Sequence, residues 1–181
     1  INEQVVLFGP YQQESWQIAF NPKELDSVET VAVFQYNRIG VEIDTLPDFY
    51  LTSAFGGRMR EQVRHYTNVA DAFEAMRKGE VSAVMGMRSE IDHELAKSEN
   101  AMFEAAGNGF PGIGKQVWDV GMAIKHTHRQ LGYALEAIID RLVKTGEMNE
   151  LMASQKLRYS VPGYYREFLD EQAIARAEGD L

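Results

Sequence analysis

The sequence holds few side-chain arrangements that could carry out catalysis or bind a metal. His126 and His128 lie two positions apart at a predicted strand-to-helix turn, but no third ligand accompanies them. His93 and Glu94 lack the second histidine of a zinc hydrolase motif. No G-x-S-x-G serine motif occurs, and no two carboxylates are arranged as general acid and base. The residues therefore predict no enzyme, no metal site and no cofactor.

Two strand ends are the places where a ligand is expected in an α/β protein. The run at 81–87 (VSAVMGM) is typical of a buried strand, and its end at Met85, Gly86 and Met87 carries no acid, base or nucleophile. Thr45 follows another predicted strand, and with the N–H groups of the next helix it could hold an anion. An ordinary capping box of Thr45 and Asp48 is the favoured alternative, because nearby carboxylates repel anions.

Aromatic and glycine-rich segments offer weaker hypotheses. Aromatic side chains could line a cleft for an apolar ligand or a partner's segment, although core packing explains them equally well; these are Trp16, Tyr36, Phe49, Tyr50 and Trp118. The segment 106–114 holds four glycines but lacks the Lys-Ser/Thr of a phosphate-binding loop, so a flexible loop is favoured.

Composition limits the class of protein. The chain has 181 residues, 45% of them hydrophobic, which is enough for one domain or two small lobes. A formal net charge of -9 disfavours nucleic acids as partners. No apolar run reaches the length of a membrane span, and the absence of cysteine excludes disulfides and thiolate sites. The sequence starts at Ile1 without a leader, which favours a processed chain.

Hydrophobic periodicity predicts strands alternating with helices. Turns are expected at 9–11 and 21–23, and helices start near Leu46, after Asn68 and at Thr127, where Thr127 and Gln130 form a capping pair. Strands are expected at 15–20, 30–35, 38–43, 81–87 and 116–124, and further helices at 88–97, 147–155 and 164–178. This alternation predicts the α/β class, with a mostly parallel sheet and helices on both faces.

In this order, the segments resemble a type II periplasmic solute-binding protein of the family that serves ABC importers. The resemblance rests on RIGVEIDTLPDFYL (38–51), on the helix, Lys-Gly-Glu-Val and strand unit between Asn68 and Met85, on WDVGMAI (118–124), and on the helix that ends at Gly146. It implies a periplasmic binding protein-like II fold with two lobes joined by crossing strands. Residues 1–20 would end lobe 1 and cross, 21–115 would form lobe 2, and 116–181 would cross back and pack on lobe 1. The first strands of lobe 1 would lie outside this sequence, so we expect a truncated or proteolysed chain with uncovered apolar faces.

The resemblance also implies a function. Amino-acid-binding members carry an Asp near the strand end where Met87 stands, so ordinary amino-acid binding is disfavoured. The branch most like WDVGMAIK is that of the J proteins encoded beside PQQ-dependent methanol dehydrogenases, of the lanthanide or calcium type. This implies a noncatalytic periplasmic accessory protein that helps to mature or activate such a quinoprotein dehydrogenase, its partner. The alternative is the receptor of an ABC importer for a small neutral or acidic solute. The expected ligand or partner cleft comprises Tyr11, Trp16, Thr45, Leu46, Phe49, Tyr50, Met85, Gly86, Met87 and Trp118.

Overall fold

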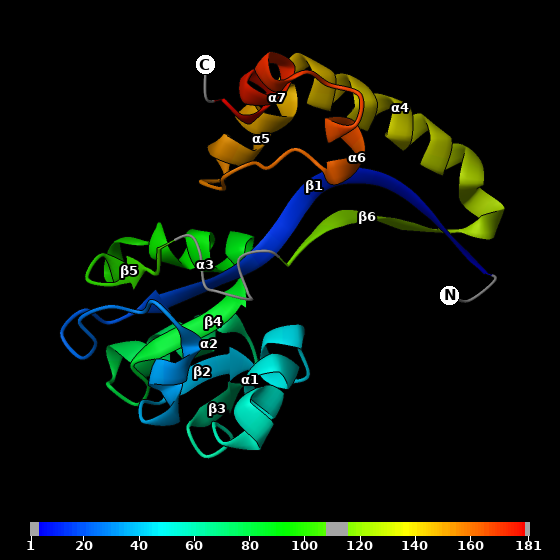
Figure 1. Cartoon of the computed structure of the whole chain (residues 1–181). Helices are drawn as coiled ribbons and strands as arrows, with labels where there is room; N and C mark the ends of the chain where they lie inside the picture. Colours follow the sequence, from blue (N-terminus) through cyan, green and yellow to red (C-terminus); the bar gives the residue numbers. More distant parts are fainter. Residues whose placement is uncertain (1–3, 108–115, 180–181) are drawn as a thin grey trace. The chain divides into compact units, whose positions relative to one another are not determined.

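The computed structural model describes residues 4–107 and 116–179 (Figure 1). The chain divides into two compact units. Unit 1 consists of Ile1–Glu14 and Val117–Leu181, and unit 2 consists of Ser15–Gln116. One strand, β1 (Val5–Phe20), contributes residues to both units.

Unit 2 is built on a sheet in the order β3-β2-β4-β1-β5. The strands β2 (Ile39–Glu42), β3 (Val63–Tyr66) and β4 (Ala83–Met87) are parallel. The end of β1 runs antiparallel to β4, with Trp16 opposite Met87, and the short β5 (Glu104–Ala105) pairs with β1 on its other side. The carboxyl ends of the three parallel strands therefore lie along one edge of the sheet.

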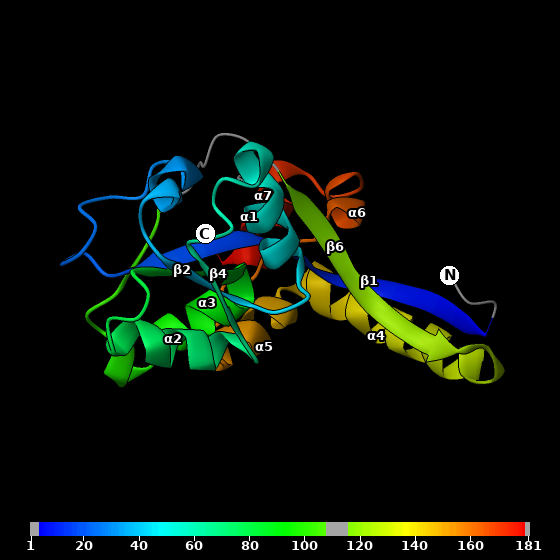
Figure 2. The same cartoon turned by 90° about the horizontal axis from the view of Figure 1, so that it is seen from below.

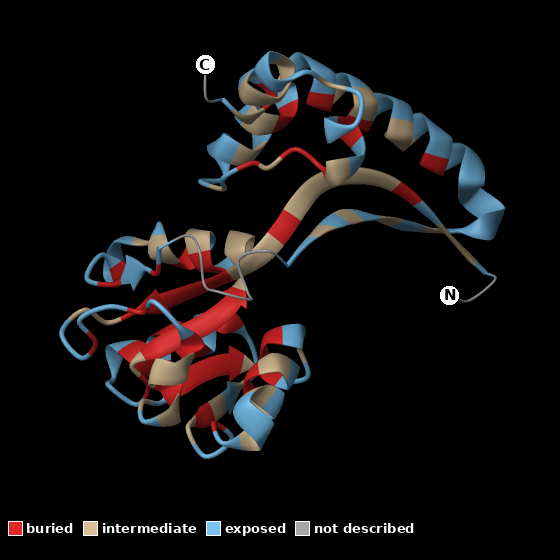
Figure 3. Ribbon diagram, viewed as in Figure 1, coloured by how far each residue is buried: buried red, intermediate tan, exposed pale blue. Residues whose placement is uncertain are grey.

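Helices cover both faces of this sheet because alternate residues of each buried strand point to opposite sides. One face presents Ile18, Met85 and their neighbours to α1 (Leu46–Gly57) and to the 3₁₀ helix η1 (Val31–Gln35). The other face presents Ala19 and Val84 to α2 (Val69–Arg77) and α3 (Arg88–Leu95). Figure 3 shows the central strands of unit 2 as buried. This burial on both faces explains why the central strands are almost wholly apolar.

Unit 1 combines the start of β1 with β6 (Val117–Lys125), which pair with each other (Figures 1 and 2). Its helices are α4 (Arg129–Thr145), α5 (Glu147–Ser154), α6 (Gly163–Arg166) and α7 (Glu171–Glu178), and the 3₁₀ turn η3 (His126–His128) precedes α4. The other short 3₁₀ turn, η2 (Ser98–Asn100), belongs to unit 2. Its core contains Ile139, Val143, Met148, Tyr159, Val161, Tyr165 and Ala177.

Much apolar surface of unit 1 is exposed. The strand β6, described over its whole length, has no buried residue. In α4 the side chains of Leu131, Tyr133 and Ile138 are about half exposed, whereas Ile139 and Val143 are buried. The apolar stripe that predicted α4 is therefore only partly covered by the residues that the structure describes. No helix among those residues has the length and apolar character needed to cross a bilayer.

Several predicted elements were wrong in detail. The run at 30–35 is 3₁₀ helix instead of strand, because Val31 and Phe34 bury their side chains at a spacing of three. The predicted turn at 9–11 lies within β1, where Gly9 takes a positive φ of 101° and approaches the backbone of Gly121.

At the predicted start of α4 the Thr127–Gln130 capping pair is not formed. Residues 126–128 make a 3₁₀ turn, Thr127 Oγ1 lies 3.1 Å from His128 Nδ1, and the α-helix begins at Arg129. The predicted tail helix at 164–178 is divided into α6 and α7, and the second begins where Asp170 Oδ1 accepts the Ala173 N–H at 2.7 Å. Most of the glycine-rich segment, 108–114, lies outside the described residues.

Candidate functional site

The carboxyl ends of β2 and β4 are the candidate site in unit 2. These strands are neighbours, and the helices that follow them pack on opposite faces of the sheet: α1 after β2 on one face, and α3 after β4 on the other. Such a divergence is a topological switch point, where the first turns of two helices face a shared opening at the end of the sheet. Ligands of open α/β sheets bind at this position.

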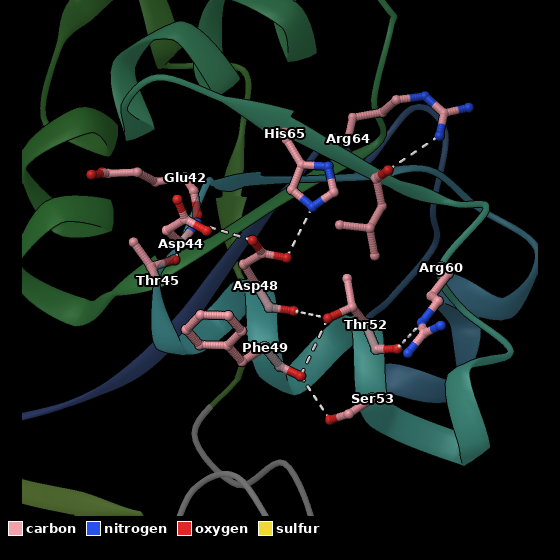
Figure 4. Close-up of polar contacts among 11 residues, drawn as sticks. Glu42, Asp44, Thr45, Asp48, Phe49, Thr52, Ser53, Arg60, Arg64 and His65 are labelled. Carbon is pink, nitrogen blue, oxygen red and sulfur yellow. Dashed lines mark hydrogen bonds and ion pairs between the residues drawn. The ribbon is translucent and has the colours of Figure 1, made fainter.

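The turn from β2 into α1 is held by a buried carboxylate (Figure 4). Asp44 adopts a left-handed backbone with φ of 60°, and its N–H donates to Asp48 Oδ2 at 3.0 Å. Thr45 precedes the helix but does not cap it, since its hydroxyl donates to the Glu42 carbonyl at 2.6 Å. The predicted capping box is therefore not formed: the Thr45 side chain makes no capping bond, and Asp48 accepts the N–H of Asp44, one residue before the N-cap, instead of that of Thr45.

His65 supplies the second bond to this carboxylate. Its Nε2 lies 2.9 Å from Asp48 Oδ1, and the Asp48 side chain is 8% exposed whereas that of His65 is 40% exposed. The two oxygens of Asp48 are therefore bonded to groups from the β2–α1 turn and from β3. His65 also lines a cavity of about 270 Å³ together with Ile43, Tyr66, Thr67 and Asp71.

The end of β4 has an acid after all. Glu90, in the first turn of α3, accepts the Met87 N–H on Oε2 at 3.2 Å. Partial desolvation raises the pKa of the Glu90 carboxyl, the bond from Met87 lowers it, and the negative charge of Glu42 raises it further. Residue identity at the strand end did not reveal this group, because its side chain returns from three positions later.

Exposed apolar side chains accompany the carboxylates at this edge. Ile43, directly after β2, and Leu46 and Phe49, in the first turn of α1, are each more than half exposed. Large apolar side chains gathered around a few polar groups are typical of small-molecule sites. The edge therefore combines apolar contact surface with four carboxylates, those of Glu42, Asp44, Asp48 and Glu90.

The predicted cleft residues in unit 2 separate into two groups. Thr45, Leu46 and Phe49 lie at the start of α1, and Trp16 lies opposite Met87 at the end of β4. The Trp16 indole N–H donates to Gln116 Oε1 at 3.0 Å. Tyr50 is half-buried against the core, and burial raises its pKa.

Met85 and Gly86 are corrections to the predicted cleft. Met85 has no exposed surface and packs with Ile18 in the core. Gly86 is also buried, and a Cβ there would meet Ile91 and Val69 at 3.3 Å. Met85 packs on one face of the sheet and Gly86 is covered on the other, so neither residue offers a surface to a ligand.

Tyr11 and Trp118 belong to unit 1 and remain predicted cleft residues. Tyr11 is half-buried against the core of unit 1, and its carbonyl accepts the Tyr159 hydroxyl at 3.0 Å. Trp118 is half-buried on β6. Across residues 4–107 and 116–179, no group of three or more His, Cys, Asp or Glu side chains could hold a metal ion.

Sequence comparison identifies no relative: no family model and no curated protein matches the chain. Solved structures do match it. An ancestral arginine-binding protein bound to glutamine superposes with a TM-score of 0.64 at 19% identity, over 86% of this chain and 67% of that one. The amino acid ABC transporter substrate-binding protein AbpA from Streptococcus pneumoniae, bound to L-arginine, gives 0.69 at 15% identity, over 86% and 64%. The solute receptor for L-cysteine of Neisseria gonorrhoeae gives 0.63 at 16% identity, over 93% and 62%.

This chain thus spans between 62% and 67% of the length of these three proteins. All three are binding proteins, and none is described as an accessory of a dehydrogenase. At these identities the likeness concerns the fold. The chain has the periplasmic binding protein-like II fold, which it shares with these three binding proteins.

Proposed function

We propose that this protein is a noncatalytic solute receptor of an importer, acting in the periplasm, and that unit 2 contacts its solute at the carboxyl ends of β2 and β4. The observation that carries the proposal is the switch point between these strands, where the starts of α1 and α3 face one edge of the sheet. The shared fold with three solute-binding proteins supports it.

The charges at this edge narrow the class of solute. Glu42 and Glu90 lie on the α3 side, and Asp44 and Asp48 lie on the α1 side. Four carboxylates repel an anionic group, so the solute presents a neutral or positively charged group to unit 2. An ammonium or guanidinium placed near Glu42 and Glu90 would also offset the desolvation and the repulsion from Glu42 that raise the pKa of Glu90. Glu90 thereby takes over a role that the bare strand end does not fill.

The test is calorimetry and thermal melting of the protein with L-arginine, L-glutamine, L-cysteine and L-glutamate. Binding to the folded state alone raises the melting temperature, so one of the first three solutes should shift it by several degrees, and L-glutamate should not. Replacing Glu90→Gln or Glu42→Gln should weaken binding of L-arginine about tenfold, the usual loss when a charge-assisted bond is removed.

Glu61→Gln is the matched control, because Glu61 is exposed in the turn before β3 and its removal changes the net charge equally. Equal losses in all three variants would contradict a local role of Glu42 and Glu90. The dehydrogenase-accessory role remains a prediction that the shared fold supports less well than solute binding. Co-purification with a quinoprotein dehydrogenase, without a thermal shift for any small solute, would favour that role over the proposal.

A further inference from the structure

A chain of two hydrogen bonds connects β3 to the start of α1. His65 Nε2 lies 2.9 Å from Asp48 Oδ1, and Asp48 Oδ2 accepts the Asp44 N–H at 3.0 Å. Figure 4 shows the imidazole and the Asp44 backbone on opposite sides of the same carboxylate. The three groups come from β3, α1 and the turn before α1, so the contact joins parts of the chain that are separate in sequence.

The Asp44 bond matters because this residue directs the chain from β2 into α1. Its left-handed φ of 60° is unfavourable for a residue with a side chain, although aspartate tolerates it better than most. A conformation of this kind persists when surrounding contacts determine it. The Asp48 carboxylate supplies such a contact, whereas the Thr45 hydroxyl is already committed to the Glu42 carbonyl at 2.6 Å.

Asp48 in turn depends on His65. The Asp48 side chain is only 8% exposed, and a buried carboxylate is costly unless both oxygens receive hydrogen bonds. Without the imidazole, one oxygen of the buried Asp48 carboxylate would lose its hydrogen bond, and the side chain would be more stable if it turned toward water. That movement would break its bond to the Asp44 N–H.

We propose that His65 is a positioning residue for the solute site: through Asp48 it fixes Asp44 and the first turn of α1, and so sets the affinity of the edge where the solute binds. The part that concerns affinity rests on the proposed function. His65 itself lies one strand further from β4 than Asp44 does and lines its own cavity with Thr67 and Asp71. Its effect is therefore transmitted through Asp48.

The experiment compares His65→Gln with His65→Asn in the whole chain. The side-chain nitrogen of glutamine occupies nearly the position of histidine Nε2, whereas that of asparagine corresponds to Nδ1 and falls short of Asp48. Both variants carry the same amide, so a general effect of polarity or of lost charge would be equal in the two. Only a role that depends on reaching Asp48 is rescued by glutamine and not by asparagine.

The first readout is the rate of hydrogen exchange at the Asp44 amide, which is measured by NMR in the absence of any solute. We expect exchange in His65→Asn to be at least tenfold faster than in the wild type, and exchange in His65→Gln to be within twofold of it. Asp48→Asn breaks the same chain, so the double variant Asp48→Asn/His65→Asn should be no faster than the worse single variant. Unchanged protection of Asp44 in His65→Asn would overturn the proposal.

The second readout is the affinity for L-arginine, L-glutamine and L-cysteine. His65→Asn should weaken binding of whichever solute the wild type takes by about fivefold or more, and His65→Gln should restore it. Weakened protection of Asp44 with unchanged affinity would overturn the claim that this turn sets affinity. If the wild type binds none of the three solutes, the proposed function fails, and the exchange rates of Asp44 alone then decide whether His65 orders the turn.

Discussion

The ring of Phe8 lies directly against the backbone of Gly132. A Cβ built at residue 132 would stand 2.2 Å from a ring carbon of Phe8, far inside the distance at which two carbons can pack. Gly132 is buried near the start of α4, and Phe8 is 6% exposed on β1. The contact lies wholly within unit 1 and brings the helix backbone close to the strand.

Gly132→Ala should therefore destabilise unit 1 even though alanine favours helices. The added methyl group forces the Phe8 ring or the helix to move, and such overpacking costs typically about 1–3 kcal/mol. Denaturant unfolding monitored by circular dichroism measures the loss. Ala137→Gly, at an exposed position of the same helix, is the control for helix propensity. In the double variant Phe8→Ala/Gly132→Ala the ring is absent, so adding the methyl group to the Phe8→Ala variant should cost less stability than adding it to the wild type. A neutral or stabilising Gly132→Ala would show that the ring moves freely.

Two adjacent isoleucines of α4 should respond very differently to truncation. Ile139 is 7% exposed in the core of unit 1, whereas Ile138 is 49% exposed. Ile139→Ala should cost about 2–5 kcal/mol because it leaves a cavity, and Ile138→Ala should stay within about 0.5 kcal/mol. Urea unfolding of the two variants gives the comparison directly. Similar losses would mean that Ile138 is covered in solution by a contact that the described residues do not make.

A buried polar residue should be as important to unit 2 as an apolar one. Asn100 is 0% exposed, its Oδ1 accepts from Arg77 Nη1 at 2.6 Å, and its Nδ2 donates to the Glu94 carbonyl at 2.8 Å. Asn100→Ala removes both bonds at a position with no exposed surface, so we expect a loss of about 2–3 kcal/mol in thermal or urea unfolding. Asn37→Ala, which removes a single half-buried bond to the Val33 carbonyl, should lose less. A larger loss at Asn37 would contradict this ranking.

Unit 1 should lose stability in alkali because of two buried tyrosines. Burial, followed by the charges of nearby acids, raises the pKa of Tyr165 to about 12, and burial also raises the pKa of Tyr159 well above its usual value. The pKa of an unfolded tyrosine is about 10. Between that pH and the pKa in the folded protein, the unfolded state has lost protons that the folded state retains. Stability is thus full below pH 10 and falls as pH rises above it.

The measurement is the free energy of unfolding between pH 8 and 12. Absorbance at 295 nm monitors the ionisation of the tyrosines over the same range. Tyr165→Phe and Tyr159→Phe should each flatten the alkaline decline, because the group that would ionise is gone. Tyr36→Phe is the matched control, since Tyr36 is 84% exposed in unit 2. An alkaline decline that is the same in all four proteins would refute the role of the two buried tyrosines.

Local patterns predicted the elements whose ends depend on neighbouring residues. Asn68 was predicted to begin a helix, and its Oδ1 accepts the Asp71 N–H at 2.8 Å while Val69, Phe73 and Met76 are buried. Valines and aromatics at 30–35 favour a strand equally well, and only the buried pair Val31 and Phe34 selects the 3₁₀ helix. That selection depends on the core of unit 2, which no local window contains.

The site divides in the same way. Glu90 was within reach of sequence reasoning, because a glutamate three residues after a strand end can return to the first N–H of the next helix. The His65–Asp48 contact was not, since the two residues are 17 positions apart and meet only when β3 pairs with β2 beneath α1. The sequence predicts that Met85 and Gly86 form a strand end open to a ligand, but packing on both sheet faces buries them.

Unit 2 begins and ends at neighbouring points, since the indole of Trp16 and the amide of Gln116 are bonded at 3.0 Å. A stretch of polypeptide whose termini meet behaves as an insertion, and insertions of this kind tolerate excision, grafting and circular permutation. A gene segment that encodes residues 15–116 should therefore yield a protein that folds without unit 1. Unit 1 is formed by two separate segments of the chain, so it can be produced alone only if a new linker joins them.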